Sequence, residues 1–434
     1  MQSSWLRLQS HPDPALRRLW NVMQVAVLGM PLNILLGGVT ILVCSLMVWR
    51  RRANVMVQTF VNQGLLLLGS WMVIIALFAQ RRDYSLPGLF NFLPFFVVFV
   101  AQARLIRTQQ QMRRLAWLLL LPMVPVAIMG LGQLFLRWRF HWQVLNFGDS
   151  DGILLDWALV RFGRPAGRMS SLFYYATILA SYLTMTFTIG LGLWIDAWRE
   201  KHRWIRKVGL GAIVLLNAVA LFLTNSRNAW GIALAVVVAY SVYIGWRFIA
   251  WITLVVVAAV VGSAYGPASP VQEGLRTIVP RMIWARINDD LFLNRPPASL
   301  RVNQWKFAWD LVCQRPLTGW GLRNFTPLYK DATQFYIGHP HNLPLMLSAE
   351  MGVPATLIFY SLIGWIVYRG VVWLRKAEGR DRFTMFIYVL TFMACTVFSL
   401  FDVTLFDARV NVMGWLVLAA IWGWGRRWRI PMKR

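Results

Sequence analysis

Long apolar segments recur along almost the whole chain. Each is long enough to cross roughly 30 Å of hydrocarbon at about 1.5 Å per helical residue. They lack the alternation of apolar and polar residues found in barrel strands, so the pattern predicts an all-α polytopic membrane protein. The clear predicted spans cover about 61–80, 86–106, 115–136, 170–197, 206–224, 229–246, 248–265, 343–368, 383–402 and 409–425.

The first apolar region, residues 21–49, has two interpretations. It is one long span, or two short tilted spans that meet near Gly37 and Gly38. Two crossings give about twelve transmembrane helices with both termini on one side, and a single crossing gives eleven. We favour twelve, because the N-terminal arginines then share a side with the other basic clusters.

Composition agrees with the membrane class: 58% of the residues are hydrophobic and 14% are charged. A net charge of +27 would suggest nucleic-acid binding in a soluble protein. Basic loops beside apolar spans are instead typical of membrane topology, so we expect membrane lipids and no nucleic acid as partners. The polar first twenty residues predict no cleavable signal peptide, and three scattered cysteines predict no disulfide. The basic clusters fall on one predicted side, the cytoplasm, at 50–52, 104–114, 199–207, 247, 369–382 and 426–434.

Two large polar segments, 137–169 and 266–342, fall on the opposite side. We interpret them as a first and a large periplasmic loop of a single membrane domain, residues 1–434. The second contains a predicted amphipathic helix over 299–313, with Ser299 as its N-cap.

Arginines are unusually frequent in these outer segments, where positive charge is normally sparse. Because a guanidinium binds phosphate through paired donors, the excess favours a polyanionic ligand. Arg227 lies in a polar break between two apolar runs, and Arg301 lies at the start of a predicted helix that attracts anions. Glu350, inside an apolar run, either pairs with an arginine or stays protonated at a helix interface.

Two histidines, His339 and His341, stand where a polar segment meets an apolar helix. Pro340 between them stiffens the segment, and Asn342 is suited to orient a ring or a substrate. The pair can act as a proton acceptor near neutral pH. A His-x-His pair can also bind metal, but no Cys or third His is nearby. Asp149 and Asp151 form a short metal-binding pattern that is common by chance.

Several of these residues resemble a known family. His341-Asn342, nine residues and Gly352 are similar to a motif of the O-antigen ligase family, with Ala355 where that motif has glycine. Further blocks resemble the wider O-antigen ligase and polymerase superfamily: Ser226-Arg227, Ser299-Leu-Arg301 with Trp305, Pro316 to Phe325, and Arg168 to Phe173. The resemblance spans about residues 165–360. It is more specific for the superfamily as a whole than for a ligase rather than a polymerase.

The family implies a glycosyltransferase C-type membrane fold in the bacterial inner membrane, with a periplasmic active site. It implies transfer of O-antigen polysaccharide from undecaprenyl pyrophosphate to lipid A–core, in lipopolysaccharide biosynthesis, with no metal or other cofactor. We expect His341 to be the general base and Arg227 and Arg301 to bind the pyrophosphate, so that direct displacement inverts the anomeric centre. Expected substrate contacts or supports are His339, Asn342, Arg168, Arg323 and Asp402, with Asp407 as an alternative to Asp402.

Three alternatives remain at this point. The chain could be an O-antigen polymerase or a protein O-oligosaccharyltransferase, which would share the donor. It could instead be a lipid-linked oligosaccharide transporter, although its few charged residues within spans argue against that class. Within the site, the base could be His339, because only the motif spacing favours His341.

Overall fold

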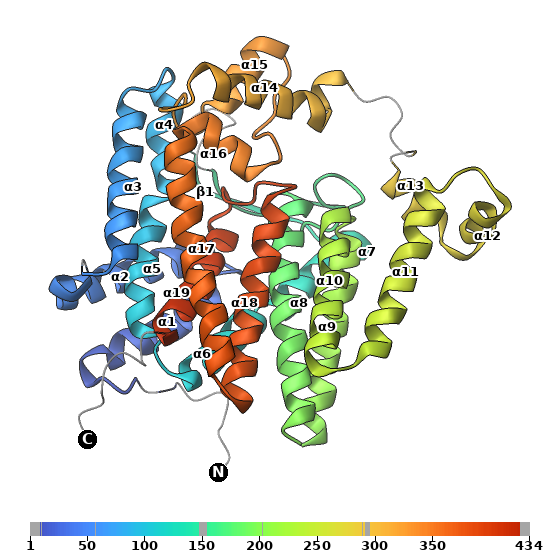
Figure 1. Cartoon of the computed structure of the whole chain (residues 1–434), viewed down its shortest axis with the longest axis horizontal. Helices are drawn as coiled ribbons and strands as arrows, with labels where there is room; N and C mark the ends of the chain where they lie inside the picture. The colour runs from blue at the N-terminus through green and yellow to red at the C-terminus, as the bar shows by residue number, and fades with distance from the viewer. Residues whose placement is uncertain are drawn as a thin grey trace.

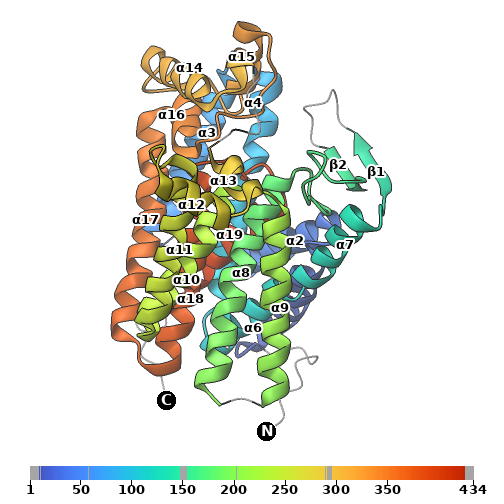
Figure 2. The same cartoon turned by 90° about the vertical axis from the view of Figure 1, so that its right-hand side faces the viewer.

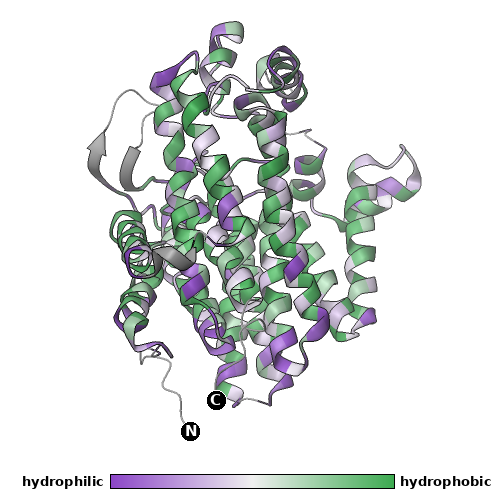
Figure 3. Ribbon diagram, turned by 60° about the vertical axis from the view of Figure 1, so that its left-hand side comes forward, coloured by the Kyte–Doolittle hydropathy of each residue, from purple (hydrophilic) through white to green (hydrophobic). Residues whose placement is uncertain are grey.

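A computed structural model describes residues 9, 11–56, 58–146, 154–201, 203–288, 290 and 296–425. Long helices lie side by side along one direction, and shorter helices gather at one end, at the top of Figure 1. Hydrophobic residues follow the long helices, and hydrophilic residues concentrate toward the two ends (Figure 3). The predicted all-α polytopic membrane fold is confirmed.

Ten helical segments within the described residues are long and apolar enough to cross a membrane. Nine of the ten predicted spans have a counterpart among them, and Ile34–Arg51 within the first apolar region is the tenth. Two of these segments are broken by a turn: Arg82–Leu105 holds α4 (Arg82–Gly88) and α5 (Leu93–Leu105), and Gln109–Phe135 holds α6 (Gln109–Leu120) and α7 (Met123–Phe135). The others are α2 (Ile34–Met56), α3 (Phe60–Leu77), α8 (Ala176–Arg199), α9 (Trp204–Leu223), α10 (Arg227–Ile244), α11 (Arg247–Tyr265), α17 (Val353–Lys376) and α18 (Gly379–Ser399).

The remaining predicted crossings correspond to α1 (Arg17–Gly29) and α19 (Ala408–Gly425). Helix α1 has 13 residues, or about 20 Å, which is short for a span. The break between α1 and α2 lies at residues 30–33, so its predicted position near Gly37 was wrong. Gly37 instead lets α2 approach that turn, because a Cβ there would lie 2.4 Å from the Cα of Met30. Helices α1 and α2 run across the lower half of Figure 1 rather than along the bundle.

Helix α8 stands at the centre of the bundle, with 83% of its spanning segment buried. It packs on α9, α10 and α18, and Figure 2 shows α8 and α9 as neighbours. Helix α19 is buried against α5, α17 and α18. The turns α5–α6, α8–α9 and α17–α18, which carry basic clusters, all lie at the lower end of Figure 1.

The two predicted outer segments meet at the opposite end. The first contains a two-stranded antiparallel sheet, β1 (Phe140–Asn146) and β2 (Leu154–Leu159), which the sequence pattern did not predict. Asp149 and Asp151 lie outside the described residues. The second contains α12 (Pro270–Ile278), α13 (Arg281–Ile287), α14 (Arg301–Gln314) and α15 (Phe325–Thr333).

Two predicted helix boundaries were wrong in this region. Ser299 does not cap α14: the N-cap is Leu300, and the Ser299 hydroxyl donates to the carbonyl of Pro296 at 2.7 Å. The predicted span 343–368 is divided into α16 (Leu343–Met351) and α17 by Gly352. Gly352 has a φ of 83°, and a Cβ there would lie 2.2 Å from the carbonyl oxygen of Leu317. This position therefore requires glycine.

Candidate active site

The segment from His339 to Asn342 leads into the N-terminus of α16. The indole of Trp305 on α14 donates to the carbonyl of Pro340 at 2.9 Å and holds the segment in place. His341 has a φ of 54°, a conformation that costs a non-glycine residue on the order of 1 kcal/mol and is typical of functional sites. The Asn342 side chain accepts from the Leu345 amide at 2.9 Å, so it caps α16.

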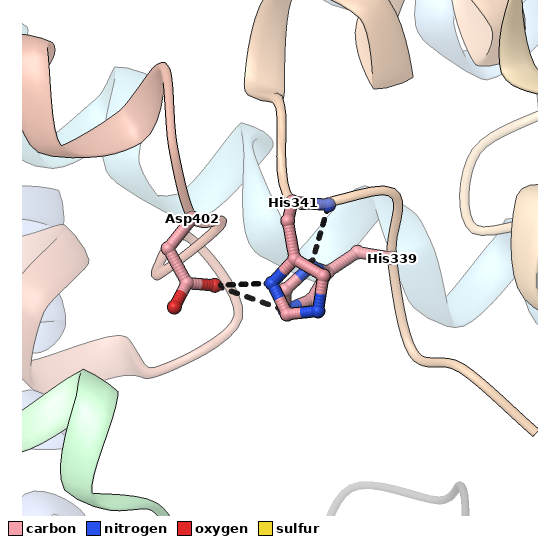
Figure 4. Close-up of side chains that lie close together, drawn as sticks. All are labelled: His339, His341 and Asp402. Carbon is pink, nitrogen blue, oxygen red and sulfur yellow. Dashed lines mark hydrogen bonds and ion pairs between the residues drawn. The ribbon is translucent and has the colours of Figure 1, made fainter. Parts of the chain in front are cut away.

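Asp402, in the loop between α18 and α19, meets both histidines. His341 Nδ1 lies 3.0 Å from Asp402 Oδ1, and His339 Nε2 lies 3.6 Å from the same oxygen (Figure 4). The Val403 amide also donates to this oxygen, at 2.9 Å. The Asp402 side chain is 4% exposed, whereas that of His341 is 29% exposed. A buried carboxylate therefore supports a histidine that solvent or substrate can reach.

The hydrogen bonds distinguish the two rings. His339 Nδ1 accepts from the His341 amide at 3.2 Å, so its proton is on Nε2, facing Asp402. Burial, together with the neighbouring His341, lowers the pKa of His339 to about 3, which makes it a weak base. Since the ionised Asp402 accepts a hydrogen bond from His341 Nδ1–H, Nε2 of the neutral ring carries the lone pair.

Asp402 is ionised. Burial opposes its charge, but the hydrogen bond from His341 and the nearby positive charge of Arg301 hold the pKa of the carboxyl well below its usual range. Arg301 also helps to depress the pKa of His339. Arg301, the first residue of α14, therefore acts electrostatically on the histidine–aspartate cluster.

His339, His341 and Asp402 could also hold a metal ion, since one ligand atom from each lies within 4.8 Å of the others. Two histidines and a carboxylate form a common metal-binding set. The positive charges of Arg301 and Arg168, which act on this cluster, disfavour a dication there. The same charges favour an anion.

Arg168 interacts electrostatically with Asp402, and Arg227 and Arg286 lie beside Arg168. Arg168 donates to the carbonyl of Thr224 at 2.8 Å, and Arg227 donates to the carbonyls of Arg286 and Ile287 at 3.2 and 3.0 Å. Arg286 donates to the carbonyl of Asn225 at 3.3 Å. Burial and the charges of Arg286 and Arg227 lower the pKa of Arg168 to about 10, and Asp402 opposes this shift. All three side chains are therefore anchored on backbone oxygens and act on one another.

Arg323 lies at another edge of the site. Its guanidinium stacks 5.1 Å above the centre of the Phe406 ring, which is 6.1 Å from the His339 ring. Of the two candidate aspartates, Asp402 belongs to the cluster, whereas Asp407 pairs with Arg409 at 2.6 Å. The fold thus brings Arg168, Arg227, Arg301, Arg323, His339, His341 and Asp402 to one region.

Arg286 was missed as a site residue. The general excess of outer arginines included it, but no local pattern separated it from its neighbours. Its position depends on α13 packing against α11 and on the turn that begins α10. Only the tertiary contact identifies it.

Comparison with known families bears on this site. Residues 212–360 match the model of the O-antigen ligase family. The resemblance to the O-antigen ligase and polymerase superfamily is confirmed. No curated protein matches the chain.

The matched O-antigen ligase segment, about a third of the chain, contains Arg227, Arg286, Arg301, Arg323 and both histidines. Arg168 and Asp402 lie outside it and join the site through the fold. The match supports an enzyme of the membrane glycosyltransferase kind, with a general O-antigen ligase or polymerase type of function. Lipid-linked polysaccharide and lipid A–core are the partners that this family implies in general. With its apolar helices, the chain is a multi-pass membrane protein.

Proposed function

We propose that the protein is an O-antigen ligase. It transfers O-antigen polysaccharide from undecaprenyl pyrophosphate to a sugar hydroxyl of lipid A–core. The observation that carries this proposal is the 3.0 Å contact between His341 Nδ1 and Asp402, with a cluster of arginines around it. A base and a polyanion site are the two requirements for displacing a pyrophosphate from a sugar.

In this mechanism, His341 Nε2 takes the proton of the acceptor hydroxyl, and Asp402 stabilises the imidazolium that forms. The hydroxyl oxygen attacks the anomeric carbon, and the bond from that carbon to the pyrophosphate oxygen breaks. The leaving group takes the electron pair, and the anomeric centre inverts. Arg227 and Arg301, together with Arg168, bind the developing negative charge. No metal takes part.

His339, Asn342 and Arg323 serve the substrates less directly. His339 is neutral, and its ring packs against that of His341 with 4.5 Å between the centroids, so it limits the orientation of the base. Asn342 fixes the start of α16 directly after the base. Arg323 offers a charge at the edge of the site.

The proposed location is the bacterial inner membrane, with the site facing the periplasm. The basic turns at the opposite end of the molecule support this orientation, because basic residues accumulate on the cytoplasmic side. Both substrates are lipid-anchored, and a site at the end of a membrane bundle suits them.

Turnover with purified donor and lipid A–core tests this proposal. We expect His341→Ala to reduce turnover by roughly 10²- to 10⁴-fold, the usual contribution of a general base. The matched control is His141→Ala, since His141 is exposed on β1. Near-normal turnover by His341→Ala would refute the base assignment.

Acceptor exchange separates the alternatives. Growth of the donor's own glycan, without lipid A–core, would identify a polymerase, and transfer to a protein hydroxyl would identify an oligosaccharyltransferase. Donor translocation into proteoliposomes without any transfer would favour the transporter.

A further inference from the structure

Glu350 is a buried acid that the proposed chemistry does not use. It lies in the last turn of α16, outside the ten candidate spans, and is 2% exposed. Its Oε1 accepts from the amide of Phe325, the first residue of α15, at 3.4 Å, and the amide of Arg323 also donates to its carboxylate. A carboxylate accepting two amides at a helix N-terminus is well placed to fix the backbone there.

The turn from Pro316 to Phe325 is fastened to the same end of α16. The amides of Trp320 and Gly321 donate to the carbonyls of Ala349 and Glu350 at 3.0 and 2.8 Å. Gly319 permits this approach, because a Cβ there would lie 2.5 Å from the carbonyl carbon of Glu350. Helix α16 therefore carries His341 just before its start and holds the turn of Arg323 at its end.

Arg323 connects this turn to the site. Its φ of 59° directs the chain out of the turn, and its guanidinium stacks on Phe406 beside His339. We propose that Glu350 is a positioning residue: by holding the backbone of Arg323 and Phe325, it sets the distance between the Arg323 guanidinium and the His341 base. This inference rests on the proposed function, in which Arg323 meets an anionic group of a substrate.

Burial raises the pKa of Glu350 to about 7, against the opposing amides of Arg323 and Phe325 and the charge of Arg323. Since the folded pKa exceeds the unfolded one, folding favours the protonated acid, and that stability is lost as the pH rises through 7. At pH 8 the ionised side chain therefore works against folding. A residue kept only for stability would not need that charge.

The test is a double-mutant cycle at pH 8 with Glu350→Gln, Arg323→Ala and the combined variant. Glutamine replaces one carboxylate oxygen by an NH2 group, which cannot accept an amide, and removes the negative charge, so the hold on Arg323 should weaken. We expect Glu350→Gln to raise the donor KM about tenfold with a smaller effect on kcat, and the combined variant to resemble Arg323→Ala alone. If the effects of the two single substitutions on the donor KM multiply in the combined variant, the two residues act independently and the proposal is wrong. Glu350→Asp should recover part of the effect.

Two further measurements separate positioning from simple damage. The melting temperature of Glu350→Gln at pH 8 should equal or exceed that of the wild type, and a lower value would indicate a structural role. Hydrogen exchange of the amides of Arg323 and Phe325 should accelerate in Glu350→Gln, while the α8–α9 region stays unchanged. This readout needs no turnover. If hydrogen exchange accelerates in Glu350→Gln but the wild type shows no ligase activity, the proposed function is wrong, while Glu350 still fixes the turn of Arg323. If exchange is unchanged, Glu350 does not fix this turn and the inference is wrong.

Discussion

Two buried aspartates, at opposite ends of the bundle, have different neighbours. Asp196 on α8 accepts from Arg113 at 2.8 and 2.9 Å and from Arg380 at 3.2 Å. Asp402 instead contacts His341 and His339, while the arginines near it donate to backbone carbonyls. The first aspartate is neutralised by strong cations. The second aspartate, Asp402, is paired with histidines instead of with arginines.

This difference separates an ion cluster that joins helices from the cluster to which we assign the proposed chemistry. At Asp196, guanidinium groups from α6 and α18 join three helices around one carboxylate. At Asp402, two histidines contact the carboxylate instead, and Arg168 and Arg301 act on it only electrostatically. Burial of an acid is thus not itself a sign of catalysis, because a buried carboxylate can equally serve an ion cluster that joins helices.

The largest expected effect comes from replacing each aspartate by asparagine. Asp402→Asn should lower turnover by roughly 10²-fold or more, because His341 loses the charge that fixes its tautomer and stabilises its imidazolium. Asp196→Asn should lower the free energy of unfolding by roughly 3 kcal/mol, since two cations lose their partner, with turnover per folded molecule unchanged. Assays of activity and thermal unfolding in detergent check both, and an equal loss of activity in the two variants would contradict the comparison.

Arg286→Gln should have the next largest effect. Its guanidinium acts on Arg168 beside Asp402, so we expect the donor KM to rise about tenfold, equivalent to roughly 1.4 kcal/mol. The matched control is Arg276→Gln, because Arg276 also donates to a carbonyl, that of Ser263 at 2.9 Å, and stacks on Trp284. Equal KM values for the two variants would remove Arg286 from the site.

His339→Gln should alter the pH dependence of stability. The folded pKa of His339, about 3, is below its ordinary value of 6.5. As the pH falls below about 6.5, the unfolded chain gains a proton that the folded protein does not bind, so the wild type loses stability. The variant should lose about 1–2 kcal/mol less between pH 7 and pH 5. Unfolding at both pH values checks this, and a parallel loss in the two proteins would contradict it.

Removal of divalent cations by a chelator should leave turnover unchanged. Turnover of the purified protein in excess EDTA should equal that in added magnesium, because the charge around His339, His341 and Asp402 is positive. Loss of activity that a divalent cation restores would instead identify these three residues as metal ligands.

Much of the fold could be predicted because apolar runs determine membrane helices directly. The failures were local. The break after α1 depends on Gly37 meeting Met30, and the division between α16 and α17 depends on Gly352 meeting Leu317. Both are contacts between segments, which periodicity does not encode.

The sequence alone determined the membrane class, and it supplied the predictions that the arginines lie on the outer side and that His341, Arg227 and Arg301 are site residues. Motif spacing favoured His341, whereas a polar break between apolar runs and a predicted helix start indicated Arg227 and Arg301; all three lie within the family-matched segment. Tertiary structure supplied the contact on which we base the proposal that His341 is the base. Asp402 lies 61 residues beyond His341, and only packing of the loop between α18 and α19 against α16 brings its charge to one ring nitrogen. Locally, the His341 amide occupies the Nδ1 atom of His339, so the two rings have different hydrogen-bond partners.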